Sequence, residues 1–216
     1  MIAKVCILDV DGVLIDYFPR HYQVLKDYAK DYKCKITSLK DYRHKRREGF
    51  KDTDILELLN PDKNFQSFLP YKLSRIEIPK YLNYDKQIKN ASNTLEQISQ
   101  KASVLLLTAR NRKKYLKLEL EKLGIVKYKS LMLAKKDQSK KEIKKITKWL
   151  RQYGKISQTI YVGDGLDDAL LAKNLGLPFF AVTMGYSNRE MLKSYKPHKI
   201  LRSITSLTEY FKHEQP

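Results

Sequence analysis

The chain has 216 residues, 42% of them hydrophobic, which is enough to bury a proper core in one domain with an insert or in a large and a small domain. Its formal net charge of +19 favours acidic partners such as nucleic acid, phosphorylated protein or an anionic surface, although a basic surface also serves solubility. Because the sequence has no signal-peptide pattern and no run of about 18 apolar residues, we expect a cytoplasmic protein without membrane insertion, and export by a signal-less route stays open. The two cysteines, Cys6 and Cys34, match no metal-ligand spacing.

Short apolar runs predict five buried strands of a parallel sheet. These runs are Val5–Leu8, Val104–Leu107, Ser130–Ala134, Thr159–Val162 and Phe179–Val182. Between the last four runs, apolar residues recur at helical spacing, and each of the three segments ends near a glycine, a usual helix stop. The apolar positions are Tyr115, Leu118 and Leu123 before Gly124; Ile143, Ile146 and Leu150 before Gly154; and Ala169, Leu170 and Leu175 before Gly176. Alternating strands and helices predict an α/β fold, a Rossmann-like parallel sheet with helices on both faces.

The region after the first strand breaks this alternation. It carries helical patterns, basic clusters and three prolines, but no long apolar run that would make a buried strand. The helical patterns are Tyr22, Leu25, Ala29 and Tyr32, and then Ile55, Leu56 and Leu59. We therefore predict a mostly helical insert over residues 16–95, with residues 1–15 and 96–216 forming the core around the sheet.

Polar residues that suit a phosphate and a cation follow several predicted strands at their carboxyl ends, where open parallel sheets bind ligands. In chain order they are Asp9, Asp11 and Gly12; Thr108, Ala109 and Arg110; Lys135, Lys136, Lys140 and Lys141; and Asp164, Asp167 and Asp168. Asp9 and Asp11 would repel each other if buried together, and a cation would offset that cost. Mg²⁺ prefers a few carboxylates, several waters and a phosphate oxygen. The combination therefore predicts a magnesium and phosphate site, although each motif alone has an ordinary explanation as a turn, a helix cap or a solvated face.

Two of the lysines have a further argument. The stretch Ser139-Lys140-Lys141-Glu142 reads as a capping box, which places both lysines in the first turn of a helix. A cation there opposes the helix dipole by about 0.3–1 kcal/mol, and a bound phosphate would reverse that cost.

Together these segments resemble the four motifs of the haloacid dehalogenase superfamily of phosphohydrolases, in the order in which that superfamily has them. The stretch Asp9-Val-Asp11-Gly-Val resembles motif I, and Thr108 at the end of an apolar run resembles motif II. Lys140 or Lys141 falls where motif III has its lysine, and Gly163-Asp164-Gly165-Leu166-Asp167-Asp168 resembles motif IV. The helical insert occupies the position of a C1-type cap, and its sequence indicates no particular subfamily.

The resemblance implies a Mg²⁺-dependent phosphatase that works through an aspartyl-phosphate, with Asp9 as nucleophile and Asp11 as general acid and base. It implies that phosphate is bound by Thr108, Ala109, Gly12 and a lysine, with Lys140 and Lys141 ahead of Lys135 and Lys136. It further implies Mg²⁺ ligands from Asp9, Asp11, Asp164 and Asp168, with Asp167 next in line. An acid/base aspartate at position 11 favours a phosphatase or phosphomutase over a dehalogenase or a phosphonatase.

The sequence leaves the substrate open. The net charge of +19 and an aromatic, basic insert favour a phosphoprotein, including phosphotyrosine, contacted by Tyr17, Phe18, Arg20 and Arg110. A C1-type cap suits the alternative, a small metabolite such as a sugar phosphate, phosphoglycolate or a nucleotide. A nucleic-acid end is a further alternative that we do not favour. A binding module without turnover is the least favoured reading, because all four motif positions are filled.

Overall fold

A computed structural model describes residues 3–134 and 139–213 of the chain. Six strands of the described residues form one parallel sheet in the order β5-β4-β1-β6-β7-β8. They are β1 (Val5–Leu8), β4 (Ser103–Thr108), β5 (Ser130–Leu133), β6 (Thr159–Gly163), β7 (Phe179–Val182) and β8 (Lys199–Leu201). The first strand lies inside the sheet between β4 and β6, which explains why every residue from Val5 to Leu8 is both apolar and buried.

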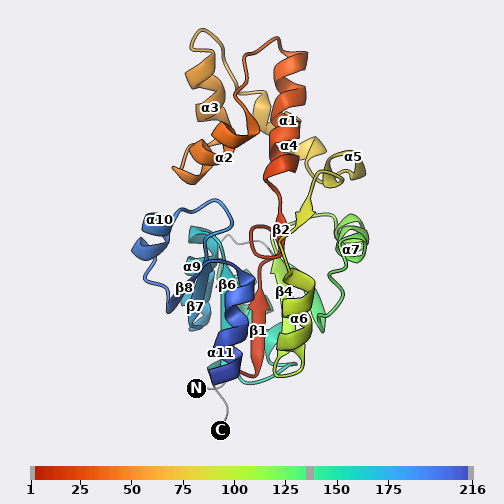
Figure 1. The fold of residues 1–216 in the computed structure, drawn as a ribbon, viewed down its shortest axis with the longest axis vertical. Helices are drawn as coiled ribbons and strands as arrows, with labels where there is room; N and C mark the ends of the chain where they lie inside the picture. Colours follow the sequence, from red (N-terminus) through yellow and green to blue (C-terminus); the bar gives the residue numbers. More distant parts are fainter. Residues whose placement is uncertain (1–2, 135–138, 214–216) are drawn as a thin grey trace.

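Helices cover both faces of the sheet, as the sequence predicted (Figure 1). Along β1 the side chains alternate: Cys6 and Leu8 face one hydrophobic cluster, and Val5 and Ile7 face the other. The first face is covered by α6 (Ala91–Ser99), α7 (Lys113–Lys122) and α11 (Leu207–His213). The second is covered by α8 (Lys140–Leu150), α9 (Leu166–Leu175) and α10 (Arg189–Ser194). Two short 3₁₀ helices, Ile156–Gln158 and Ile204–Ser206, complete this part.

Strand β8 and helix α7 both differ from the sequence predictions. The strand β8 was not predicted, because its three residues include the exposed Lys199 and make no apolar run. Helix α7 ends before Gly124 as expected, but its buried side carries Leu116 and Leu120, whereas Leu118 is 54% exposed. Its apolar residues fit more than one helical face, and the sequence pattern pointed to the wrong one.

The insert is helical and stands above the carboxyl end of β1 (Figure 1). It consists of α1 (Phe18–Asp31), α2 (Leu39–Arg47), α3 (Asp52–Leu59), α4 (Phe68–Arg75) and α5 (Pro79–Leu82). These helices span residues 18–82, within the predicted range 16–95, and from here on the name helical insert refers to residues 18–82. They have a hydrophobic cluster of their own, which includes Phe18, Tyr28 and Tyr42.

The helical insert joins the sheet through a small antiparallel pair, β2 (Ile15–Asp16) and β3 (Lys86–Gln87). Helix α6 then returns to the sheet, where Ala91, Leu95 and Ile98 belong to the first-face cluster. The limits 16–95 and the C1 class of the insert stay predictions. No helix in the described part of the chain is long and apolar enough to cross a membrane.

Candidate active site

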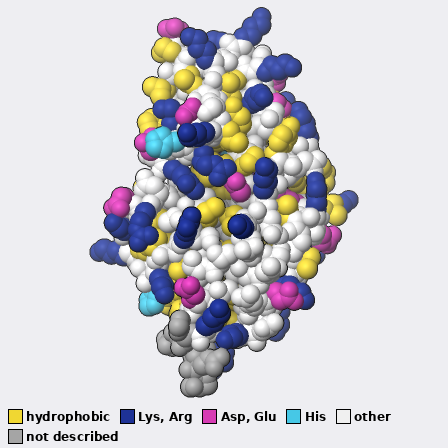
Figure 2. Space-filling model, in the orientation of Figure 1, with side chains coloured by type: hydrophobic (Ala, Val, Ile, Leu, Met, Phe, Trp, Pro, Cys, Tyr) yellow, Lys and Arg dark blue, Asp and Glu magenta, His cyan; other side chains and the backbone are white. Residues whose placement is uncertain are grey.

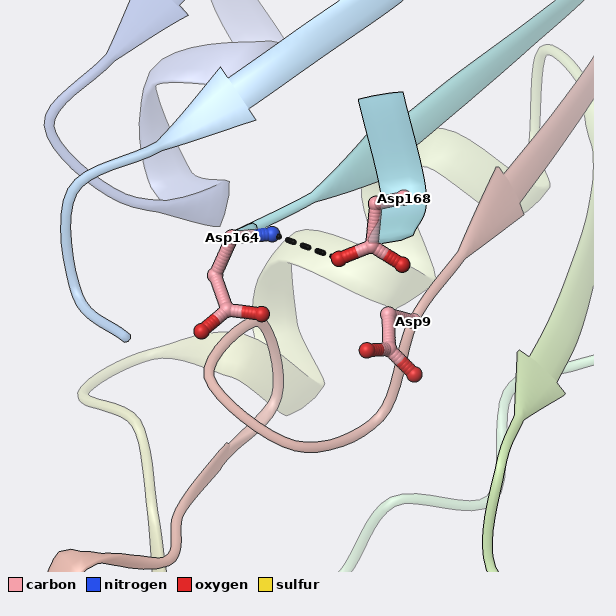
Figure 3. A group of neighbouring side chains, drawn as sticks. All are labelled: Asp9, Asp164 and Asp168. Carbon is pink, nitrogen blue, oxygen red and sulfur yellow. Dashed lines mark hydrogen bonds between the residues drawn. The ribbon is translucent and has the colours of Figure 1, made fainter. Parts of the chain in front are cut away.

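Three buried carboxylates meet at the carboxyl end of the sheet (Figure 3). Asp9 follows β1, Asp164 follows β6, and Asp168 lies in the first turn of α9. One oxygen atom of each lies within 4.8 Å of the others, and the three residues are at most 7% exposed. We call them the acidic cluster. Such a set of hard oxygen donors fits Mg²⁺, whose charge would offset the repulsion between the carboxylates.

Asp168 fixes the loop that carries Asp164. Its Oδ2 accepts hydrogen bonds from the backbone N–H groups of Asp164 at 3.1 Å and Gly165 at 3.3 Å. Its Oδ1 accepts the hydroxyl of Tyr161 at 3.1 Å. Asp168 therefore caps the N-terminus of α9 from within its first turn and at the same time faces the acidic cluster.

Two glycines make room for the carboxylate of Asp164. A Cβ atom at Gly12 or at Gly185 would overlap this carboxylate. Gly12 also has a φ of +77°, a left-handed conformation that side chains other than that of glycine rarely adopt. The loop after β1 and the loop after β7 thus pack directly against the acidic cluster.

A cavity of about 720 Å³ opens between the acidic cluster and the helical insert. Most of the predicted site residues line it. They are Asp9, Asp11, Tyr17, Arg20, Thr108, Ala109, Arg110, Asp164, Asp167 and Asp168. The helical insert adds basic groups that the sequence analysis did not assign to the site. These are His21, Arg46, Lys51 and Lys72.

Other predicted site residues lie elsewhere. Gly12 lies beneath Asp164, and Phe18 is fully buried in the helical insert. Lys140 and Lys141 stand exposed in the first turn of α8, which Ser139 caps as predicted, and the described lining of the cavity does not include them. Lys135 and Lys136 lie outside the described residues. Which lysine binds phosphate therefore stays a prediction.

The carboxylate of Asp11 is hydrogen-bonded to two arginines. Arg110 binds it with two parallel hydrogen bonds, Nε to Oδ2 and Nη2 to Oδ1, both 2.7 Å long. Arg20 adds a third from Nη2 to Oδ1 at 3.1 Å. Burial pushes the pKa of Asp11 up, but attraction to Arg110 and Arg20 outweighs it and holds the pKa well below its usual range. Both arginines were predicted to contact substrate, and no sequence pattern indicated that they bind Asp11.

Two further buried carboxyls, Asp85 and Glu119, hold Arg110 from its other side. Arg110 Nη2 lies 3.1 Å from Asp85 Oδ2, and Nη1 lies 2.8 Å from Glu119 Oε2. Arg20 Nη1 is 3.4 Å from the same oxygen of Asp85. Burial raises the pKa of Asp85 to about 9 despite the nearby arginines, and the neighbouring Glu119 adds to the rise. Sequence reasoning missed both carboxyls, because neither belongs to a motif.

Tyrosines link the helical insert to the acidic cluster. The Tyr17 hydroxyl donates to Asp164 Oδ2 at 3.3 Å, and the backbone N–H of Tyr186 donates to the same oxygen at 2.9 Å. The Tyr186 hydroxyl shares a hydrogen bond of 2.7 Å with His21 Nδ1. Arg47 of α2 donates to the backbone carbonyls of residues 183–185. The loop after β7 is thereby tied to the helical insert on one side and to Asp164 on the other.

The fold agrees with comparisons to known proteins. The chain matches the family model of haloacid dehalogenase-like hydrolases over residues 6–182 and belongs to that family. It is 30% identical over 119 residues to a phosphoglycolate phosphatase of Vibrio parahaemolyticus, which covers 54% of this chain and 52% of that protein. It is 29% identical over 123 residues to the phosphoglycolate phosphatase of Vibrio cholerae, covering 56% and 54%. The chain thus spans about half the length of the curated relatives it matches.

A solved structure supports the same fold over nearly the whole chain. A haloacid dehalogenase-like hydrolase from Streptococcus pneumoniae superposes with a TM-score of 0.75, covering 97% of this chain and 98% of that one. At 18% sequence identity, this likeness concerns the fold alone. The family resemblance seen in the sequence is confirmed.

Proposed function

We propose that the protein is a Mg²⁺-dependent phosphomonoesterase that acts on small phosphorylated metabolites. The observation that carries this proposal is the acidic cluster at the strand ends, which faces a cavity lined by basic groups of the helical insert. Family membership supports phosphate ester hydrolysis, and Mg²⁺ fits the oxygen donors of Asp9, Asp164 and Asp168. When bound, Mg²⁺ would lower the repulsion between these carboxylates and the anionic phosphate.

The proposed reaction has two halves. An oxygen of Asp9 attacks phosphorus, and the bond between phosphorus and the leaving oxygen breaks. Asp11 must carry a proton at this step, although Arg110 and Arg20 favour its ionised form, and it gives that proton to the leaving oxygen. Water then attacks the phosphorus of the aspartyl-phosphate and gives a proton back to Asp11, which releases inorganic phosphate and restores Asp9. In this proposal the phosphate oxygens are bound by Thr108, which is buried at the end of β4 next to β1, and by the backbone of Ala109; both residues line the cavity.

Three observations support a small anionic substrate. The two Vibrio relatives are named phosphoglycolate phosphatases. The cavity is covered by the helical insert, and its volume of about 720 Å³ is that of a small-molecule site. Arg46, Lys51 and Lys72 line it from the insert, where they suit a second acidic group on the substrate, such as the carboxylate of phosphoglycolate.

The comparisons support this small-metabolite reading better than a phosphoprotein substrate, which the sequence analysis preferred. Phe18 is 0% exposed, and Tyr17 lines the cavity but is only 2% exposed, so neither ring stands at the outer surface to stack on a large substrate. Phe18 contacts the rings of Tyr42 and Tyr186. An acidic macromolecular partner remains a proposal that rests on the charge of +19 and on the Lys and Arg side chains spread over the face in Figure 2.

A substrate panel tests the proposal. The native protein is given phosphoglycolate, sugar phosphates, nucleotides, phosphotyrosine peptides and para-nitrophenyl phosphate, each with Mg²⁺ and with EDTA. We expect Mg²⁺-dependent turnover with the highest kcat/KM on a small substrate that carries a second anionic group. Highest kcat/KM on a phosphopeptide, with a steep loss as salt rises, would instead support the macromolecular substrate. No turnover of any phosphomonoester would overturn the proposed function.

A further inference from the structure

Arg110 binds Asp11 in a geometry that fixes the plane of the Asp11 carboxylate. Two parallel hydrogen bonds of 2.7 Å leave the carboxylate no freedom to rotate against the guanidinium. Arg20 adds one hydrogen bond to Oδ1. A carboxylate has about four lone-pair sites, and these three bonds take both sites of Oδ1 and one of Oδ2. Among the described residues, the arginines therefore leave one site, on Oδ2 of Asp11, for a transferred proton.

Arg110 is itself held by groups from two other segments. Glu119 of α7 accepts a hydrogen bond from Nη1 at 2.8 Å, and Asp85 accepts one from Nη2 at 3.1 Å. The side chains of Arg110, Glu119 and Asp85 are 4%, 4% and 0% exposed, so water competes little for these bonds. The guanidinium thus spans three carboxyls, a geometry that a lysine ammonium cannot reproduce.

The chain origin of these groups connects Asp11 to the helical insert. Arg20 lies in the first turn of α1, just after the chain enters the insert, and Asp85 lies just after the chain leaves α5. Arg20 and Asp85 also pair with each other, with Nη1 and Oδ2 3.4 Å apart. Arg110 and Glu119, in contrast, both belong to the part of the chain around the sheet.

We infer that Arg110 is a positioning residue for Asp11, and that Arg20 and Asp85 help to hold the two side chains together. This inference rests on the proposed function, because it assigns Asp11 to proton transfer. A group that transfers a proton must lie within hydrogen-bond reach of the leaving oxygen, and small misplacements are costly. Arg110 sets that reach through its two hydrogen bonds to the Asp11 carboxylate.

The test compares two leaving groups. Phenol is a poor leaving group that needs a proton, whereas para-nitrophenol departs readily without one. The variant Arg110→Lys keeps the positive charge and loses the two parallel hydrogen bonds of the guanidinium. For this variant we expect kcat/KM to fall about 100-fold on phenyl phosphate and less than about 10-fold on para-nitrophenyl phosphate. The ratio kcat/KM is used because it reports the first phosphoryl transfer. The exposed neighbour Arg112 provides the matched control, and Arg112→Lys should leave both values unchanged.

A second variant controls for the possibility that Arg110→Lys acts through a folding defect. Glu119→Gln keeps an acceptor for Arg110 but loses the charge, and we expect a smaller loss with the same preference for the better leaving group. Equal losses on both substrates in both variants, or no loss, would overturn the inference, since a purely structural role does not depend on the leaving group. If the native protein and Arg112→Lys hydrolyse neither ester nor any other phosphomonoester, the proposed function itself fails.

Discussion

The carboxylate of Asp168 accepts the backbone N–H of Asp164 at 3.1 Å, so one acidic residue holds the backbone of another within the same cluster. We predict that Asp168→Asn weakens Mg²⁺ binding by about 10- to 100-fold, because an amide removes charge from the cluster and loosens the loop that carries Asp164. Titrating activity with Mg²⁺ measures this shift, and high Mg²⁺ should restore part of the rate.

The exposed neighbour Asp167 is the control for that experiment. Asp167→Asn should shift the Mg²⁺ dependence much less, because Asp167 lies outside the acidic cluster. Equal shifts in the two variants would mean that general charge near α9, rather than the placement of Asp168, governs metal binding.

Gly185 offers a test of how tightly the loop after β7 packs on the acidic cluster. A Cβ atom at this position would overlap the carboxylate of Asp164. Gly185→Ala should therefore lower activity about 100-fold or more by displacing Asp164, as small misplacements in active sites do. For Gly165→Ala, the nearest atom to the new Cβ is Ser187 Oγ at 3.9 Å, so this variant should stay within a few-fold of the native rate. A Gly185→Ala enzyme as active as Gly165→Ala would contradict the packing.

The raised pKa of Asp85 predicts that the stability of the folded protein depends on pH. The pKa of Asp85 is raised to about 9 in the folded protein, against about 3.9 for an ordinary aspartate, so between these values the folded state holds a proton that the unfolded state lacks. The stabilisation that this proton gives is full at low pH and is lost as pH rises toward 9. Charge counting agrees: with Asp85 protonated, Arg20 and Arg110 balance Asp11 and Glu119.

The variant Asp85→Asn has no carboxyl that titrates at this position. Its free energy of unfolding should therefore increase relative to that of the native protein as pH rises. The gain should reach up to about 1.4 kcal/mol per pH unit between about pH 6 and pH 8. Urea denaturation at both values measures it, and the exposed Asp62, changed to Asn, should show no such trend. A constant difference between Asp85→Asn and the native protein would mean that Asp85 is ionised in the folded state.

Two leucines of helix α7 allow a test of which face of this helix packs on the sheet. Leu116 is 1% exposed and Leu118 is 54% exposed. Leu116→Ala should cost about 2–5 kcal/mol of unfolding free energy, whereas Leu118→Ala should stay within about 0.5 kcal/mol. Denaturant unfolding of both variants settles the point, and a larger loss in Leu118→Ala would restore the face that the sequence pattern indicated.

The sheet and the acidic cluster were predictable for one physical reason. Fully buried strands are uniformly apolar, so Val5–Leu8 and Phe179–Val182 stand out, and both have the bounds that were expected. The carboxyl ends of parallel strands meet at one edge, which brings Asp9 and Asp164 together from distant segments. The order of the four motifs could be read directly from the order of these residues along the chain.

The network around Asp11 could not be predicted in this way. Asp85 lies in a short connection without periodicity, and Glu119 lies in a helix with six charged residues, where a buried glutamate looks like any exposed one. Their burial depends on Arg110, which approaches from the end of β4. Such tertiary pairing of charges leaves no local pattern in a sequence.

Asp9 is the residue on which the whole account depends. The most direct measurement is hydrolysis of para-nitrophenyl phosphate by the native protein, by Asp9→Asn and by the exposed control Asp62→Asn, each with Mg²⁺ and with EDTA. We predict Mg²⁺-dependent turnover by the native and control proteins, and a loss of at least about a thousand-fold in Asp9→Asn. Turnover that survives in Asp9→Asn, or that is indifferent to EDTA, would contradict the assignment of Asp9 as the nucleophile of a metal-dependent phosphatase.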